Sequence, residues 1–74
     1  MPRLPRLSGR QAVAAFQRAG FDIDRRHGSH IILSKPGHPR ALSVPDHREL
    51  RIGTLRALVR KAGLTADQFI DLVR

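Results

Sequence analysis

Apolar residues recur at intervals of three and four near the start of the chain and predict a helix over residues 9–19. Ser8 precedes this pattern and is a favourable N-cap, while Gly20 stands where a left-handed residue would end the helix. The stripe expected to face the core consists of Ala12, Val13, Phe16 and Ala19.

From Phe21 onward the apolar period changes to two, which is typical of strands with one buried face. A first strand is expected to begin there, a second to occupy residues 29–35 and a third residues 41–44. Gly28 breaks the pattern between the first two, and the segment PGHPR (36–40) predicts a tight turn. Such short connections favour three antiparallel strands in meander order. The residues predicted to face the core are Phe21, Ile23, Ile31, Leu33, Leu42 and Val44.

Helical periodicity returns in the last third of the chain, with an apolar stripe of Ile52, Leu55, Leu58, Val59 and Ala62 that ends at Gly63. Thr65 is then expected to cap a short helix with Asp67 in its first turn and Phe69, Ile70 and Val73 as core contacts.

The predicted fold is therefore α+β, in the order α-β-β-β-α(-α), with a three-stranded antiparallel sheet and helices on one face. Residues 1–7, a basic segment with prolines at positions 2 and 5, are expected to form a lead-in, and residues 8–74 a single domain. Alternation along the second strand turns His30, Ile32 and Ser34 toward the open face of the sheet.

The charge balance points to a polyanionic partner. The chain carries 14 Lys and Arg against 6 Asp and Glu, a net charge of +8, and most of the cations are arginine, whose planar fork binds phosphate in bidentate fashion. Cysteine is absent, which excludes disulfides and a thiolate zinc site. No apolar run approaches the roughly 20 residues of a membrane span, and no export signal is recognisable, so a cytoplasmic protein is expected.

Three roles are open to the histidines: metal ligand, structural hydrogen bonder or acid–base group. His27 and His30 are three apart, so one continuous strand would turn them to opposite faces, and no recognised metal-ligand spacing is present. A structural role is favoured for His27, His38 and His47, and no metal site is expected.

His30 differs because it projects from a strand onto an open face of a cationic domain. An imidazole there can exchange protons near neutral pH, and RNA supplies its own nucleophile in the 2′-hydroxyl. The residues alone still favour RNA binding over RNA cleavage, because no second group that could protonate the leaving oxygen is identifiable.

Several short motifs, taken in order, resemble the HicA/YcfA family of toxins. The matching positions are Ser8-Gly9, Gly20-Phe21, Gly28-Ser29-His30, Val44-Pro45-Asp46-His47, Gly53-Thr54-Leu55 and Ala62-Gly63-Leu64. The resemblance implies a fold like a double-stranded-RNA-binding domain and an endoribonuclease that cleaves mRNA without a metal or other cofactor. It also implies that His30 is the catalytic residue, and that a HicB-type antitoxin covers the active face in a hetero-oligomeric toxin–antitoxin complex.

The chain departs from the family pattern at two places: Phe16 replaces a leucine, and Ile31 and Ile32 follow the histidine where an aromatic residue is frequent. Gly28 is expected to bend the chain and Ser29 to position the strand start. From charge and placement we expect phosphate contacts at Arg26 and Lys35 and a wider RNA track at Arg56 and Arg60. Two alternatives remain: a non-catalytic RNA-binding module of the same fold, and a protein that only sequesters a partner through its open sheet.

Overall fold

The computed structural model describes residues 3–73, so the first two residues of the expected lead-in and Arg74 lie outside the described part. Its elements are α1 (Gly9–Arg18), β1 (Asp22–His27), β2 (His30–Ser34), β3 (Leu42–Pro45), α2 (Ile52–Lys61) and α3 (Ala66–Val73). The strands form one antiparallel sheet in the order β1-β2-β3, with β2 in the centre. The predicted α+β fold and its element order are confirmed.

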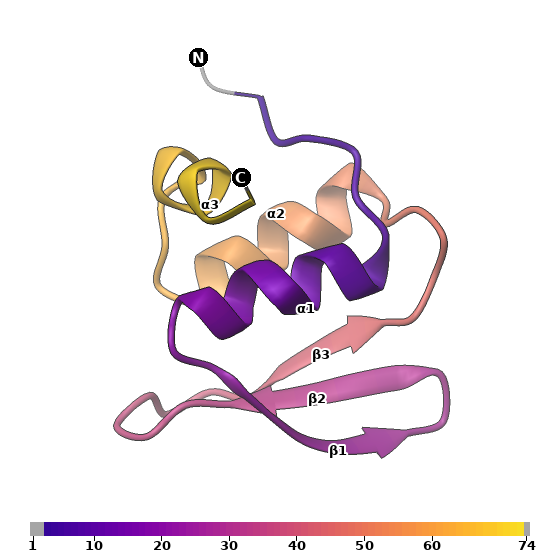
Figure 1. Cartoon of the computed structure of the whole chain (residues 1–74), viewed down its shortest axis with the longest axis vertical. Helices are drawn as coiled ribbons and strands as arrows, with labels where there is room; N and C mark the ends of the chain where they lie inside the picture. The colour runs from indigo at the N-terminus through magenta and orange to yellow at the C-terminus, as the bar shows by residue number, and fades with distance from the viewer. Residues whose placement is uncertain (1–2, 74) are drawn as a thin grey trace.

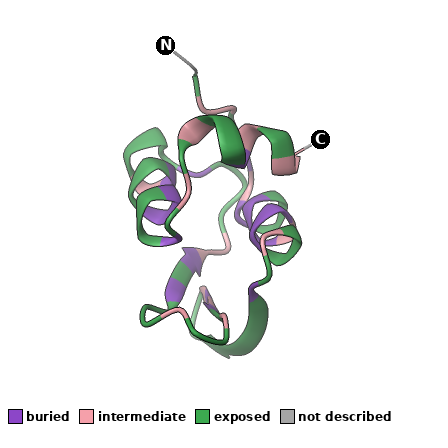
Figure 2. Cartoon of the chain, turned by 90° about the vertical axis from the view of Figure 1, so that its left-hand side faces the viewer, coloured by how far each residue is buried: buried purple, intermediate pink, exposed green. Residues whose placement is uncertain are grey.

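The helices lie on one side of the sheet. Figure 1 shows α1 and α2 above the strands and α3 beyond these two helices, while the opposite face of the sheet is uncovered. In the perpendicular view, buried positions lie where α1, α2 and the sheet face one another (Figure 2). The sheet therefore has one face that supports the core and one face that is free for function.

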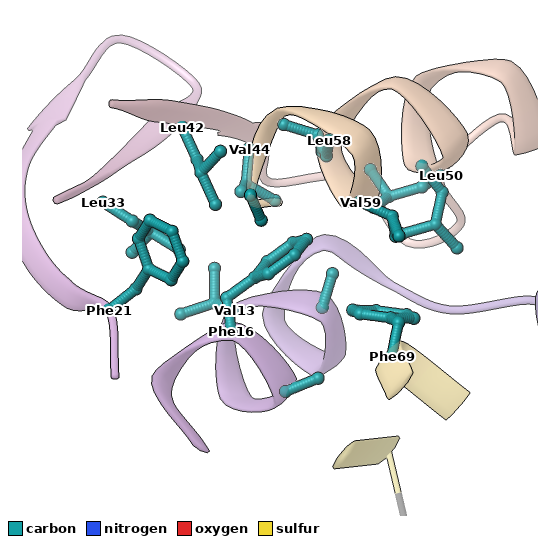
Figure 3. Packing of buried hydrophobic residues seen from close by; sticks show 14 of the residues in the cluster. Val13, Phe16, Phe21, Leu33, Leu42, Val44, Leu50, Leu58, Val59 and Phe69 are labelled. Carbon is teal, nitrogen blue, oxygen red and sulfur yellow. The ribbon is translucent and has the colours of Figure 1, made fainter. Parts of the chain in front are cut away.

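The core is built around three phenylalanines, all of which are buried as predicted. The ring of Phe16 lies 6.1 Å from that of Phe21 and 5.1 Å from that of Phe69, so α1 joins the start of the sheet to α3 (Figure 3). Leu7, which precedes α1, is also buried, and its carbonyl accepts a hydrogen bond from the Leu50 amide. The extended segment before α1 is thereby attached to the loop that leads into α2.

Local signals place the helix ends as the sequence predicts. Ser8 and Gln11 form a reciprocal capping box at the start of α1, and Thr65 forms the same pair of hydrogen bonds with Gln68 before α3. Gly20 and Gly63, with φ of 101° and 78°, end α1 and α2 in the left-handed conformation that glycine adopts readily.

Two residues predicted to be buried are exposed. Ile23 is 52% exposed because β1 is an edge strand and, of the three strands, lies farthest from the helices (Figure 1). A bulge at Asp24 also reverses the alternation along β1, so that Arg25 pairs with Ile32 and Arg26 with Ile31. Ile52 is 46% exposed, since it begins α2 and lies beside the lead-in rather than over the sheet.

Candidate active site

His30 is the first residue of β2 and lies on the uncovered face of the sheet, because Ile31 beside it is buried on the helical side. Its ring is half-buried, and its Nδ1 lies 2.7 Å from the hydroxyl oxygen of Ser43 on β3. With Nδ1 engaged in this way, Nε2 remains the ring nitrogen available to a ligand. The central strand therefore presents an oriented imidazole on an open surface.

The loop Gly28-Ser29 reverses the chain immediately before His30. Gly28 has a φ of 60°, the left-handed region expected of glycine at the first position of a type II′ hairpin turn. Its predicted bend is thus present. The carbonyl of Ser29 accepts a hydrogen bond of 2.7 Å from the Asp46 amide, which ties the loop to the end of β3. Ser29 therefore helps to hold the start of β2, where His30 lies.

Asp46 forms ion pairs with two arginines at this end of the sheet. One carboxylate oxygen lies 2.9 Å from a guanidinium nitrogen of Arg26, and the other lies 3.3 Å from Nε of Arg10. Hydrogen bonds from Arg26 and then from Arg10 hold the pKa of Asp46 below its ordinary value. Asp46 thereby connects the first turn of α1 to strand β1.

The backbones of α1 and β3 also approach each other closely at this end of the sheet. Gly9 is buried against the end of β3, and a β-carbon at this position would overlap the carbonyl oxygen of Pro45. The Gly9 amide also donates a hydrogen bond of 2.9 Å to the carbonyl of His47. Three motifs that are far apart in the sequence therefore meet at one end of the sheet: Ser8-Gly9, Gly28-Ser29-His30 and Val44-Pro45-Asp46-His47.

Of the cations expected to contact RNA, Arg26 lies at the His30 end of the sheet. Arg26 pairs with Ile31, so its side chain lies on the helical side of the sheet, where it donates a hydrogen bond to Asp46. Arg25 is the arginine of β1 that shares the uncovered face with His30, and it forms an ion pair with Asp24. Alternation from Ile23, which was predicted to face the core, would place Arg25 on the helical side and Arg26 on the uncovered face. The bulge at Asp24 reverses these two positions.

The other predicted contacts lie elsewhere. The ammonium of Lys35 donates to the carbonyl of Ala19 at 2.9 Å and lies 5.6 Å from the centre of the Phe21 ring. Lys35 lies five positions after His30 along extended chain, a span of about 17 Å. Arg56 and Arg60 line a groove of about 760 Å³ between α2, the lead-in and the start of α3. The structure therefore does not bring these three cations to His30.

The other three histidines lie in three different environments. Nε2 of His38 lies 2.8 Å from the carbonyl of Lys61, and its ring packs edge-on against Phe21, which supports the predicted structural role. His47 lies in the loop before α2, and its backbone carbonyl accepts the hydrogen bond from the Gly9 amide. His27 pairs with His30 across the hairpin, so both rings belong to the same face. The opposite orientation expected for one continuous strand does not apply, because the chain turns at Gly28 between the two residues.

Within residues 3–73, no three or more His, Asp or Glu side chains converge in a group that could hold a metal ion. None of the helices of this described part is long and apolar enough to cross a bilayer.

The structure also brings Ser43, Asp46 and His27 to the His30 end of the sheet, which the sequence alone did not predict. Alternation along residues 42–45 places Ser43 on the outward face, but only the strand register brings its hydroxyl to His30. Asp46 lies in a matched motif, yet its two arginine partners come from α1 and β1. In each case the missing information is a pairing between segments distant in sequence.

Comparison with known families adds one finding. The family model described as HicA toxin of bacterial toxin–antitoxin matches residues 9–64, more than half of the chain. The matched region includes Gly9, the hairpin with His30, and Asp46, whereas α3 lies beyond it. A search of curated proteins returned no match.

Proposed function

Because the chain belongs to the HicA family of toxins of bacterial toxin–antitoxin systems, we propose that it is an endoribonuclease that cleaves mRNA, with His30 as the catalytic acid–base residue. The observation that supports this proposal best is the hydrogen bond between His30 and Ser43 on the uncovered face. It orients an imidazole on the central strand and leaves the second ring nitrogen, Nε2, without a hydrogen bond within residues 3–73.

The chemistry needs no metal ion and no protein nucleophile. When Nδ1–H of His30 donates to Ser43, Nε2 carries a lone pair that can remove the proton of an RNA 2′-hydroxyl. The 2′-oxygen then attacks the adjacent phosphorus, and the bond from phosphorus to the 5′-oxygen breaks. The products are a 2′,3′-cyclic phosphate and a 5′-hydroxyl. Cationic groups at this end of the sheet would stabilise the charge that develops on the phosphate oxygens.

The proposed RNA contacts divide according to their distance from His30. Gly28 and Ser29 form the hairpin turn before His30 and would contact the nucleotides next to the cleaved bond. Arg26 lies at the same end of the sheet but on its helical side, so it would contact RNA that passes around this end. Lys35, Arg56 and Arg60 lie on other parts of the surface, so they could contact only more distant parts of a long RNA. We therefore place the reaction at the hairpin end of the sheet.

The proposed partner is a HicB-like antitoxin that covers the uncovered face of the sheet in a hetero-oligomeric complex. Family membership implies a toxin–antitoxin partnership, and this face carries His30 without any covering element from residues 3–73. An antitoxin bound there would block RNA access by steric exclusion. Cleavage of mRNA would place both proteins in the cytoplasm.

The test is cleavage of a mixed mRNA pool by the purified protein in excess EDTA. The wild type should cut, whereas His30→Ala should lose at least about 100-fold in rate and keep its salt-dependent RNA binding. His47→Ala is the matched control, because His47 is exposed and, within residues 3–73, forms hydrogen bonds only through its backbone carbonyl.

Equal cleavage by wild type and His30→Ala would exclude His30 as the catalytic residue. RNA binding without any cleavage by the wild type would instead support the non-catalytic RNA-binding module.

A further inference from the structure

His27 and His30 form the pair of residues that closes the β1–β2 hairpin. Directly opposed residues of an antiparallel pair point to the same face, with β-carbons typically about 4.5–5.5 Å apart. His30 is on the uncovered face, so His27 is there as well. Two histidines thus occupy opposed positions on the same face at the proposed site of RNA cleavage.

The two rings differ in their surroundings. His30 is half-buried and hydrogen-bonded to Ser43, whereas His27 is exposed. Within residues 3–73 no side-chain hydrogen bond or ion pair holds the His27 ring. The other groups on this face near the pair are the guanidinium of Arg25, which is paired with Asp24, and the side chain of Pro45. The carboxylate of Asp46 is ion-paired with Arg10 and Arg26.

Metal-free RNA cleavage involves two proton transfers. The 2′-hydroxyl must lose a proton as its oxygen bonds to phosphorus, and the departing 5′-oxygen must gain one as its bond to phosphorus breaks. A single imidazole that has just accepted a proton at the 2′-oxygen is not positioned on the other side of the phosphate at the same moment. A second donor on the neighbouring strand, with the phosphate bound between the two side chains, meets this requirement.

We propose that His27 is that second group, the acid that protonates the 5′-oxygen while His30 accepts the proton of the 2′-hydroxyl. This inference rests on the proposed function. The hydrogen bond to Ser43 suits His30 to the base role, because Nε2 is unprotonated in the neutral ring when Nδ1–H is the donor to Ser43. The exposed His27 can take up a proton from solvent before each cleavage. After the step His27 is neutral and His30 is protonated, and exchange with water restores both.

The experiment uses an oligoribonucleotide with one mapped cleavage site and a second version in which sulfur replaces the bridging 5′-oxygen at that site. A thiolate leaves without needing a proton, so the sulfur substrate does not require the acid. His27→Ala should lose at least about 100-fold on the oxygen substrate and cut the sulfur substrate at close to the wild-type rate. His30→Ala should lose activity on both substrates, and His47→Ala on neither.

The pH dependence gives a second readout. The wild-type rate should rise and then fall with pH, because it needs one unprotonated and one protonated group. His27→Ala should lose the fall at high pH and reach a plateau. His27→Gln, which keeps a polar side chain of similar reach, should behave in the same way, and circular dichroism should show that both variants are folded.

Three outcomes would overturn the inference. His27→Ala could cut the oxygen substrate at the wild-type rate, which would leave His30 acting without this partner. It could lose equal activity on both substrates, which would indicate a role in binding or folding. Finally, the wild type could cut neither substrate, which would refute the proposed function together with this inference. The first two outcomes would refute only this inference and leave the proposed function intact.

Discussion

The two faces of β2 have different surroundings and, we propose, different tasks. Ile31 and Leu33 are buried beneath the helices, whereas His30 and Ile32, which alternate with them, lie on the uncovered face. Substitutions on the helical side should therefore change the stability of the fold, and substitutions on the uncovered side should change RNA cleavage. Neighbouring residues of this single strand therefore test the division between stability and cleavage.

The largest effect is expected from Leu33→Ala on the helical face. Leu33 is fully buried, so the substitution should reduce the free energy of unfolding by about 2–5 kcal/mol. Ile32→Ala, on the other face of the same strand, should cost less than about 1 kcal/mol. Urea denaturation followed by circular dichroism measures both values. Similar losses for the two variants would contradict the division between the faces.

A second comparison concerns two glycines in the first turns of α1 and α2. Gly9→Ala should destabilise the protein by about 1–3 kcal/mol, because the new β-carbon forces α1 away from Pro45. Gly53→Ala meets no atom within 4 Å and should stabilise the protein by about 0.5–1 kcal/mol through helix propensity. Thermal and urea denaturation of the two variants should move in opposite directions. Equal shifts would mean that the approach of Gly9 to β3 does not matter for stability.

A smaller effect is expected at Ser43, the residue proposed to orient His30. Ser43→Ala removes one hydrogen bond to the ring and should reduce kcat for RNA cleavage by roughly two- to tenfold, with little change in KM. Ser43→Thr keeps the hydroxyl and should recover most of the rate. If Ser43→Thr is as slow as Ser43→Ala, the hydroxyl is not the group that matters.

The smallest effect is expected at Asp46, whose ion pairs hold the hairpin end to α1. Its pKa is lowered in the folded protein, so the stability it contributes is present above the ordinary value of 3.8 and is lost as pH falls below it. Asp46→Asn should therefore be less stable than the wild type at neutral pH, and the difference should vanish toward about pH 2. Denaturation midpoints across this range provide the measurement.

Asp24→Asn is the matched control for Asp46→Asn, since the ion pair of Asp24 joins adjacent residues only. A similar pH-dependent loss in both variants would show that the bridge from α1 to β1 has no particular importance.

Local sequence signals were sufficient for the helices, the turns and the placement of His30. Ser8 and Thr65 cap their helices through residues three positions away, and Gly20 and Gly63 end helices through their own backbone conformation. The alternation in residues 30–34 assigned each side chain of β2 to the correct face, because both neighbouring strands pair with it. Phe16, Phe21 and Phe69 were assigned to the core by the same periodicity.

The same alternation failed along β1. Nothing in residues 21–26 signals that Asp24 is an extra residue, since its ladder position depends on the register against β2. The exposure of Ile23 and of Ile52 depends on how far the helices extend over the sheet. These are consequences of packing between elements, which periodicity within one element does not contain.

By itself, the sequence determined the element order, the helix ends, the buried face of β2 and the family, because each depends on neighbouring residues or on motif order. Only the tertiary structure decided what surrounds His30. The hydroxyl of Ser43, the opposed ring of His27 and the Asp46 bridge reach this end of the sheet through strand register and helix docking. Register and docking are settled by contacts between distant segments, and such contacts leave no local pattern in the chain.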